Sequence, residues 1–280
     1  MQSAGKRTIH IARLAICGLA CVVLSGCFFV PGRFMSELDI RRDGRFTYSY
    51  VGEVVFMFPP EENLTEVSWD GSMSKCFIDE TGDRRPCLPA EVAIQRDAYE
   101  NNAKRSREAG DDLAKLIGFN PVDTKANEIL AADLMQYPGW KQVAYVGKGT
   151  FHVEYEMSGM LDRDFAFPVV PQVQMAMPFV NVARSKAGVV NISTAGLASQ
   201  QLRRLLEGQT PKVDQDDPYY VSMQSALFRT KGIFMVITDA EITSTDGKLS
   251  QSGGLQRVEW IIDSKSKTPP QVQLQLDRKL

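Results

Sequence analysis

The stretch FMSELDIRRDGRFTYSYVGEVVFMF, residues 34–58, predicts a β-hairpin, and this hairpin indicates the fold class. Apolar and polar residues alternate along both halves, which is the period of a strand with one buried face. Phe34, Leu38 and Ile40 share one face of the first half. The second half continues the alternation with six side chains, Phe46, Tyr48, Tyr50, Val54, Phe56 and Phe58. Asp43-Gly44 between them is a favoured two-residue turn, and Pro59-Pro60 ends the second strand.

Beyond the hairpin, a helical middle leads into a strand-rich end. Residues 89–117 and 124–136 have helical features, with Pro89 suited to a first helical turn, and residues 195–207 favour a further helix. Four later segments read as strands: 151–157, 233–242, 258–262 and 272–276. The order of strands, helices and strands predicts a single α+β domain over residues 34–280, with a largely antiparallel sheet and helices packed on one face.

The first 26 residues have the composition of a secretory signal peptide. Residues 1–13 carry three basic residues and no acidic one, and residues 14–24 form an uncharged apolar run. A basic segment followed by a short apolar segment is typical of a signal peptide. The apolar run is shorter than the ~20 residues that a membrane-spanning helix needs.

The sequence Leu24-Ser25-Gly26-Cys27 resembles the lipobox of bacterial lipoproteins. The resemblance implies that the Cys27 thiol is acylated, that residues 1–26 are removed, and that residues 27–33 form a lipidated N-terminus and short tether. More than one acyl chain gives stable anchoring, so the expected partner is a membrane, held through the N-terminal acyl chains. The alternative is an ordinary signal peptide that happens to contain Cys27.

The residue after Cys27 bears on which membrane carries the chain. Lipoproteins kept in the inner membrane of Gram-negative cells have Asp at this position, and this chain has Phe28. The resemblance therefore implies a lipid-anchored protein of the bacterial cell envelope, in the outer membrane and facing the periplasm.

Removal of the signal peptide makes the chain acidic. Three basic residues and no acidic residue leave, so 29 Lys and Arg stand against 34 Asp and Glu, a formal charge of −5 rather than −2. An acidic chain has no long-range attraction for nucleic acid or for an anionic membrane surface. We therefore expect no nucleic-acid partner, and acyl chains as the tether to the membrane.

Cys76 and Cys87 are the two thiols left after cleavage and acylation. The periplasm is oxidising, and the centre of the intervening stretch, Thr81-Gly82-Asp83, has turn chemistry. The pair is predicted to form a disulfide that closes a short loop. A metal pair is the alternative, but it needs more ligands than this stretch offers.

The remaining chain offers little that supports catalysis. After removal of residues 1–26 a single histidine is left, His152, and this excludes most zinc sites. His152 lies on the polar face of a predicted strand. Ser72-Met73-Ser74-Lys75 matches S-x-x-K, the nucleophile motif of penicillin-binding proteins and β-lactamases, but the accompanying S-x-N and K-T-G elements are absent. We expect no enzymatic activity, no catalytic residue, no cofactor and no metal.

Residues 165–183, FAFPVVPQVQMAMPFVNVA, are uncharged and contain three prolines, so they cannot span a membrane as a helix. One interpretation places them in the core as strand and connection. The other makes them an apolar loop or groove edge that touches an acyl chain or a partner, because Met and Phe suit adaptable apolar surfaces. The ligand-binding residues in that second interpretation are Phe165, Phe167, Met175, Met177 and Phe179.

Three segments, FMSELDIRRDGRFTYSYVGEVVF, GIFMVITDAEI and LQRVEWIID, resemble the LppM-type lipoproteins of bacteria. That family begins with an Asp-Gly strand pair after the acylated cysteine, passes through a helical middle and returns to strands. It has been linked to glycolipid binding at the envelope, so the resemblance implies an α+β envelope lipoprotein. The C-terminal membrane segment common in that family does not precede the final DRKL here.

Three functions stay open at this point. The first is a non-enzymatic, lipid-anchored domain that binds a lipid or other apolar ligand through residues 165–183. The second is a structural or assembly partner of envelope machinery, using a sheet edge and the exposed helix. The third is a serine hydrolase acting on envelope polymer through Ser72 and Lys75. We favour the first.

Overall fold

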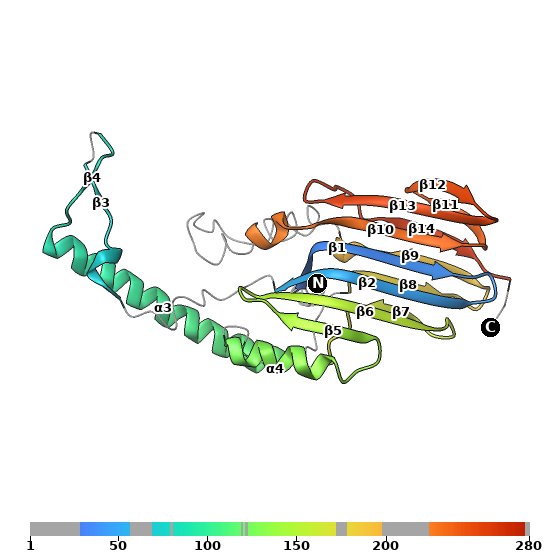
Figure 1. The fold of residues 1–280 in the computed structure, drawn as a ribbon, viewed down its shortest axis with the longest axis horizontal. Helices are drawn as coiled ribbons and strands as arrows, with labels where there is room; N and C mark the ends of the chain where they lie inside the picture. The colour runs from blue at the N-terminus through green and yellow to red at the C-terminus, as the bar shows by residue number, and fades with distance from the viewer. Residues whose placement is uncertain are drawn as a thin grey trace, which may run out of the picture.

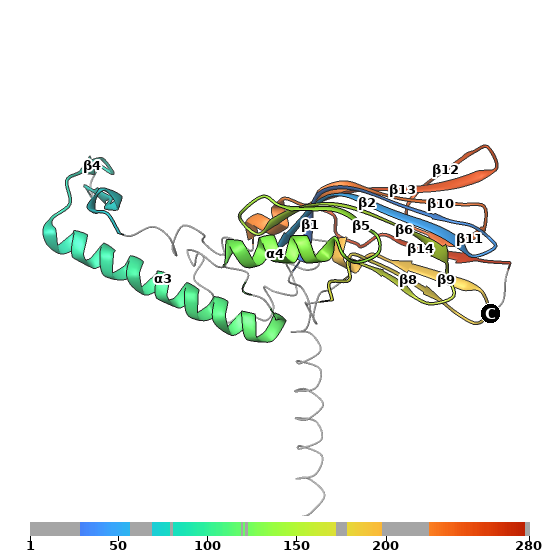
Figure 2. The same ribbon diagram turned by 60° about the horizontal axis from the view of Figure 1, so that its bottom comes forward.

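The computed structural model describes residues 29–56, 69–78, 81–118, 120, 123–171, 178–197 and 224–277. Two β-sheets face each other in the body of the molecule, and a long helix extends away from them (Figures 1 and 2). This confirms the α+β class with mostly antiparallel strands.

Strands β1 (Phe29–Ile40) and β2 (Arg45–Phe56) form the predicted hairpin. β1 begins earlier than residue 34 because Phe29 and Val30 are themselves buried, with 5% and 1% of their surfaces exposed. Residues 29–33 therefore belong to β1, and not to the tether expected over 27–33. The turn is also longer than two residues: Arg41 N–H donates to Arg45 O, and Gly44 N–H donates to Arg41 O. Gly44 has φ +91°, a conformation that glycine adopts without strain and that three-residue hairpin loops require.

The hairpin lies at the centre of a seven-stranded sheet of order β12-β13-β10-β1-β2-β6-β5. The flanking strands are β5 (Trp140–Tyr145), β6 (Thr150–Met160), β10 (Lys231–Thr238), β12 (Lys248–Ser252) and β13 (Leu255–Asp263). β1 pairs with β10 in parallel, and the other pairs of this sheet are antiparallel.

A five-stranded sheet of order β11-β14-β9-β8-β7 covers the inner face of the first sheet. Its strands are β7 (Phe165–Phe167), β8 (Val180–Arg184), β9 (Val189–Ser193), β11 (Glu241–Thr245) and β14 (Gln271–Gln275). The segment 233–242, expected to be one strand, is divided between the two sheets. The chain turns at Asp239, whose carboxylate accepts a hydrogen bond from Arg42 N–H at 2.7 Å.

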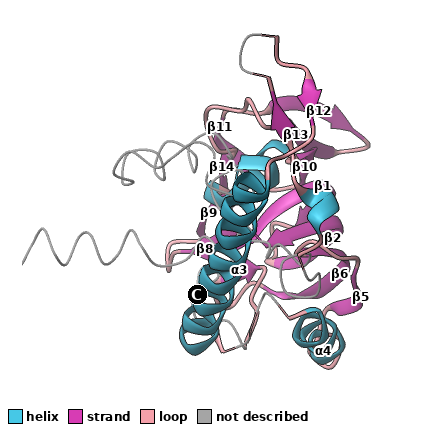
Figure 3. Cartoon of the chain, turned by 90° about the vertical axis from the view of Figure 1, so that its left-hand side faces the viewer, coloured by secondary structure: helices cyan, strands magenta, loops and turns pink. Residues whose placement is uncertain are grey.

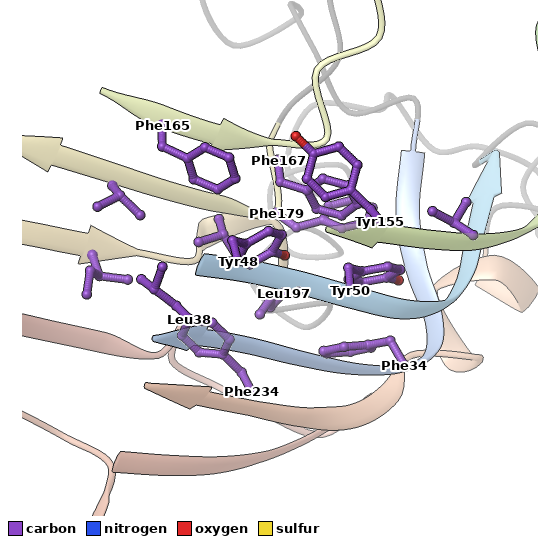
Figure 4. Close-up of a cluster of buried hydrophobic side chains, with 14 of the residues drawn as sticks. Phe34, Leu38, Tyr48, Tyr50, Tyr155, Phe165, Phe167, Phe179, Leu197 and Phe234 are labelled. Carbon is purple, nitrogen blue, oxygen red and sulfur yellow. The ribbon is translucent and has the colours of Figure 1, made fainter. Parts of the chain in front are cut away.

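The core between the sheets is rich in aromatic rings (Figure 4). Phe167 lies at its centre and is fully buried, with ring centroids 4.7 Å from Tyr155, 4.9 Å from Tyr50 and 5.2 Å from Tyr48. The fully buried phenols of Tyr48 and Tyr50 are satisfied within the core, since Ser36 Oγ donates to the Tyr48 hydroxyl at 2.9 Å and the Tyr50 hydroxyl donates to Glu53 O at 2.7 Å. Burial raises the pKa of both phenols, so they stay neutral.

The described residues form two longer helices beside the sandwich (Figures 1 and 3) and a short one, residues 224–228, before β10. α4 (Thr124–Leu134) packs beside β5 and buries Leu130, Ala131 and Leu134. α3 (Pro89–Ile117) extends away from both sheets, so the second sheet, and not helices, covers the face of the first. The sequence of the middle of α3 is dense with charged residues, which do not favour packing against an apolar core. Within the described ranges, no helix has both the length and the apolar character to cross a membrane.

Several short elements complete the described part of the fold. The expected helix over 195–207 begins as a three-residue 3-10 turn, Ala195–Leu197, and its remainder lies outside the described residues. Between the hairpin and α3, a 3-10 turn (Gly71–Met73) precedes strands β3 (Cys76–Phe77) and β4 (Arg84–Arg85), which form a separate two-stranded sheet.

Candidate functional site

A small apolar cavity lies where α4 meets the end of the sandwich at which β1 begins. Its volume is about 10 Å³, which is about what one water molecule needs. All ten residues that line it are aliphatic or aromatic: Phe29, Val54, Leu130, Leu134, Trp140, Val143, Phe151, Val153, Pro168 and Val170. A cavity of this composition stays dry and accepts only apolar groups.

Local sequence features position two of the elements that form this cavity, α4 and β5. Asp123 caps α4 by accepting a hydrogen bond from Lys125 N–H at 2.8 Å, which starts the helix so that Leu130 and Leu134 share its inner face. Gly139 then brings the chain into β5. Its φ is +91°, and a Cβ there would lie 2.6 Å from the Tyr155 ring, so a glycine is required for Trp140 to reach the cavity.

The five residues expected to bind a ligand separate into two groups. Phe165, Phe167 and Phe179 lie in the core, with 8%, 0% and 0% of their surfaces exposed, as the core interpretation of this stretch expects. Met175 and Met177 lie outside the described residues, and so does Cys27. Pro168 and Val170, from the same stretch, line the apolar cavity.

Cys76 and Cys87 form the predicted disulfide, with Cα atoms 5.3 Å apart. Glu91 is the third potential ligand near them, but the thiols are bonded to each other and the Glu91 carboxylate is bonded to Arg85. The group is therefore a covalent and ionic clamp rather than a metal site.

This clamp fixes β3 and β4 onto the start of α3, and we call residues 69–78 and 81–99 the tip. Arg85 and Glu91 form a bidentate ion pair at 2.8 and 2.6 Å, and Glu91 also accepts from Leu88 N–H. The Arg85 guanidinium lowers the pKa of Glu91 to about 2. Gln95 bonds both backbone groups of Lys75.

Four large apolar side chains of the tip are exposed. Phe77, Ile78, Leu88 and Ile94 expose 50%, 38%, 62% and 69% of their surfaces. The clamp holds them in fixed positions, and none of the four belongs to the sandwich core. Sequence reasoning missed this patch, although apolar residues beside a disulfide-closed loop are a visible signal.

His152 belongs to a polar cluster on the outer face of the large sheet. Its Nε2 lies 3.9 Å from Glu53, whose carboxylate is 3.2 Å from Arg229 and accepts from Arg33 N–H at 3.2 Å. The cluster ties the start of β1 to β2 and, through Arg229, to the segment that leads into β10. Its evident role is to hold the beginning of β1 in place.

Ser72 and Lys75 are both exposed, in and just after the 3-10 turn of the tip. Ser72 N–H donates to the Asp70 carboxylate at 3.1 Å. The S-x-x-K motif therefore does not begin an apolar helix.

The fold and cavity describe a class, a β-sandwich of the α+β type with a dry apolar cavity beside α4 at one end. No protein-family model matches the chain, and no curated protein does. Among solved structures, the folded domain of the LppM protein of Mycobacterium tuberculosis is similar at 13% identity and a TM-score of 0.27, over 90% of this chain and 92% of that one.

An M1 zinc metallopeptidase from Deinococcus radiodurans is similar at 10% identity and a TM-score of 0.28, over 90% of this chain and 43% of that one. Both TM-scores are below 0.5, and neither similarity shows what this chain does.

Proposed function

We propose that the chain is a lipid-anchored lipoprotein of the bacterial cell envelope, in the outer membrane facing the periplasm, that binds a lipid or other apolar ligand without catalysis. The observation that carries the binding proposal is the dry cavity between α4 and the sandwich. The lipobox sequence that ends in Cys27 supports the anchor.

An acyl chain is larger than the cavity, so binding requires α4 to move outward from β5. α4 has only 11 residues, and it buries the apolar side chains of Leu130, Ala131 and Leu134 together with Asn127 near its start. An entering acyl chain replaces these contacts with equivalent apolar ones, which keeps the cost of opening small.

Native mass spectrometry of the purified chain with added phosphatidylglycerol tests the binding site. Val143→Phe fills the cavity and should abolish the lipid adduct. Val190→Phe is the matched control, because Val190 is an equally buried valine that does not line the cavity. Both substitutions overpack the core by about 1–3 kcal/mol. Equal loss of the adduct in both variants, or an adduct that survives Val143→Phe, would contradict the proposed site.

The exposed patch of the tip favours a second candidate, a structural or assembly partner of envelope machinery. Apolar side chains that are held in place at the far end of α3 suit a protein–protein contact. In this case an envelope protein, and not a lipid, should accompany the chain through purification. Phe77→Ser together with Ile94→Ser should release it, whereas Val143→Phe should not.

Catalysis by Ser72 and Lys75 is the least favoured candidate. We expect neither a β-lactam nor a fluorophosphonate to label Ser72, because the serine is exposed in a three-residue turn. Labelling that disappears in Ser72→Ala would overturn the non-enzymatic proposal.

A further inference from the structure

The end of the sandwich at which β1 begins is fixed close to the proposed anchor. Phe29 is the first residue of β1, and its ring packs 5.4 Å from Phe56 and 6.4 Å from Phe151. Two residues further on, Pro31 O accepts a hydrogen bond from Thr230 Oγ1 at 2.8 Å. The chain is therefore held in the body from Phe29 onward.

Only Phe28 separates Phe29 from Cys27. Two fully extended residues span about 7 Å at most. If Cys27 carries acyl chains in a bilayer, this end of the sandwich must lie at the lipid headgroups, because no tether can hold it away from them.

Two loops and a short helix, residues 224–228, at this end have the side chains that such a contact needs. Val146, Val169 and Phe228 expose 51%, 57% and 58% of their surfaces. They belong to the same end. Gly149 O accepts from Phe56 N–H at 2.7 Å, and Arg229 donates to Thr150 Oγ1 at 3.2 Å. Pro168 and Val170, on either side of Val169, line the cavity together with Phe29.

The described residues at this end include a group whose charge does not oppose the contact. Lys148, Arg229 and Lys231 lie there with Glu53 and Asp263, so this group does not share the net negative charge of the mature chain. Cationic side chains beside exposed apolar ones are favourable at an anionic headgroup layer.

We propose that this end, marked by Val146, Val169 and Phe228, is the face that contacts the bilayer. The proposal rests on the proposed acylation of Cys27. α3 extends beyond this end, roughly along the direction of the strands (Figure 1), and a helix with so many charges cannot enter hydrocarbon. The molecule therefore does not stand upright on this end. It lies with α3 along the membrane surface and with the residues around Phe29 against the headgroups, so that the cavity beside Phe29 faces the lipid that it is proposed to bind.

Depth-dependent quenching tests the orientation with the full, acylated chain in vesicles of phosphatidylethanolamine and phosphatidylglycerol. Val146→Cys and Val169→Cys, each carrying an environment-sensitive fluorophore, report on the proposed face. Met160→Cys is the control, because Met160 is also exposed, at 40%, but pairs with Arg45 at the opposite end of the sheet.

A quencher attached to the lipids should reduce emission several-fold more at 146 and 169 than at 160. Equal quenching on vesicle-bound chain would overturn the proposed face and leave the anchor intact. A chain whose intact mass lacks acyl groups would overturn the anchor and the face together, so the two failures are distinguishable.

Discussion

Adding one methyl group at Gly32 should weaken the packing of β1 on β2. A Cβ there would lie 2.4 Å from Glu53 Oε2 and 2.7 Å from Glu53 Cβ, and the Glu53 carboxylate is already engaged by Arg229 and by Arg33 N–H. Gly32→Ala should therefore lower the free energy of unfolding by about 1–3 kcal/mol, measured by urea denaturation.

Gly71→Ala is the control for that substitution, because an added Cβ there meets no atom within 4 Å. It should change the free energy of unfolding by less than about 0.5 kcal/mol. Equal effects at the two glycines would show that the contact with Glu53 is not what requires Gly32.

Phe167 is the residue that distinguishes core from ligand site within residues 165–183. It is fully buried against Tyr48, Tyr50 and Tyr155. Phe167→Ala should cost about 3–5 kcal/mol of stability, whereas Phe77→Ala, at an exposed phenylalanine of the tip, should cost little. Thermal denaturation compares them, and a Phe167 variant with unchanged stability would contradict its place in the core.

The clamp of the tip should depend on pH through Glu91. The pKa of Glu91 is lowered from 4.5 to about 2 by the hydrogen bonds from Arg85 and Leu88 N–H. Its contribution is therefore fully present above pH 4.5 and is lost as the pH falls through about 2. NMR of the Leu88 amide should show an unchanged shift down to about pH 4 and movement below it; Glu91→Gln should remove the transition. If the chemical shift of the wild-type Leu88 amide instead changed with a midpoint near pH 4.5, the ion pair would be contradicted.

The disulfide should stabilise the tip without stabilising the sandwich. Cys76→Ser with Cys87→Ser opens a loop whose closure is worth about 3 kcal/mol in the chain-entropy model. Amide hydrogen exchange at Ile78, which donates to Asp83 O, should accelerate, while exchange in β10 stays unchanged. Faster exchange in both places would show that tip and sandwich unfold as one unit.

At the scale of elements, the sequence predicted the features that depend on residues close together in the chain. The bounds of α3 follow from Pro89 at its start and Gly118 after its end, and the β1–β2 hairpin follows from alternation around Asp43-Gly44. The division of residues 233–242 between two sheets was not predictable, because it depends on the contact of Asp239 with Arg42, far away in the sequence. The predicted length of the hairpin loop was wrong for a similar reason, because the alternation of apolar and polar residues does not determine which residues of the two strands are hydrogen-bonded to each other.

At the scale of the molecule, the pairing of the two ends of the chain was beyond sequence reasoning. β1 pairs in parallel with β10, so Arg33 lies beside Lys231. The apolar cavity likewise combines residues of β1, β2, α4, β5 and β6 with Pro168 and Val170, and only these last two belong to a stretch that the sequence indicated as a possible ligand site. The lipobox, in contrast, is a contiguous motif, which is why the sequence indicates an anchor more directly than a binding site.

The central claim is that this sandwich is held at a membrane through Cys27, directly before β1. The mass of the N-terminal peptide from the membrane-bound chain tests it most directly. We predict a peptide that begins at Cys27 and carries a diacylglyceryl thioether, and we predict that Cys27→Ser abolishes both processing and membrane attachment. A peptide with an unmodified Cys27, or one that begins at another residue, would contradict the claim.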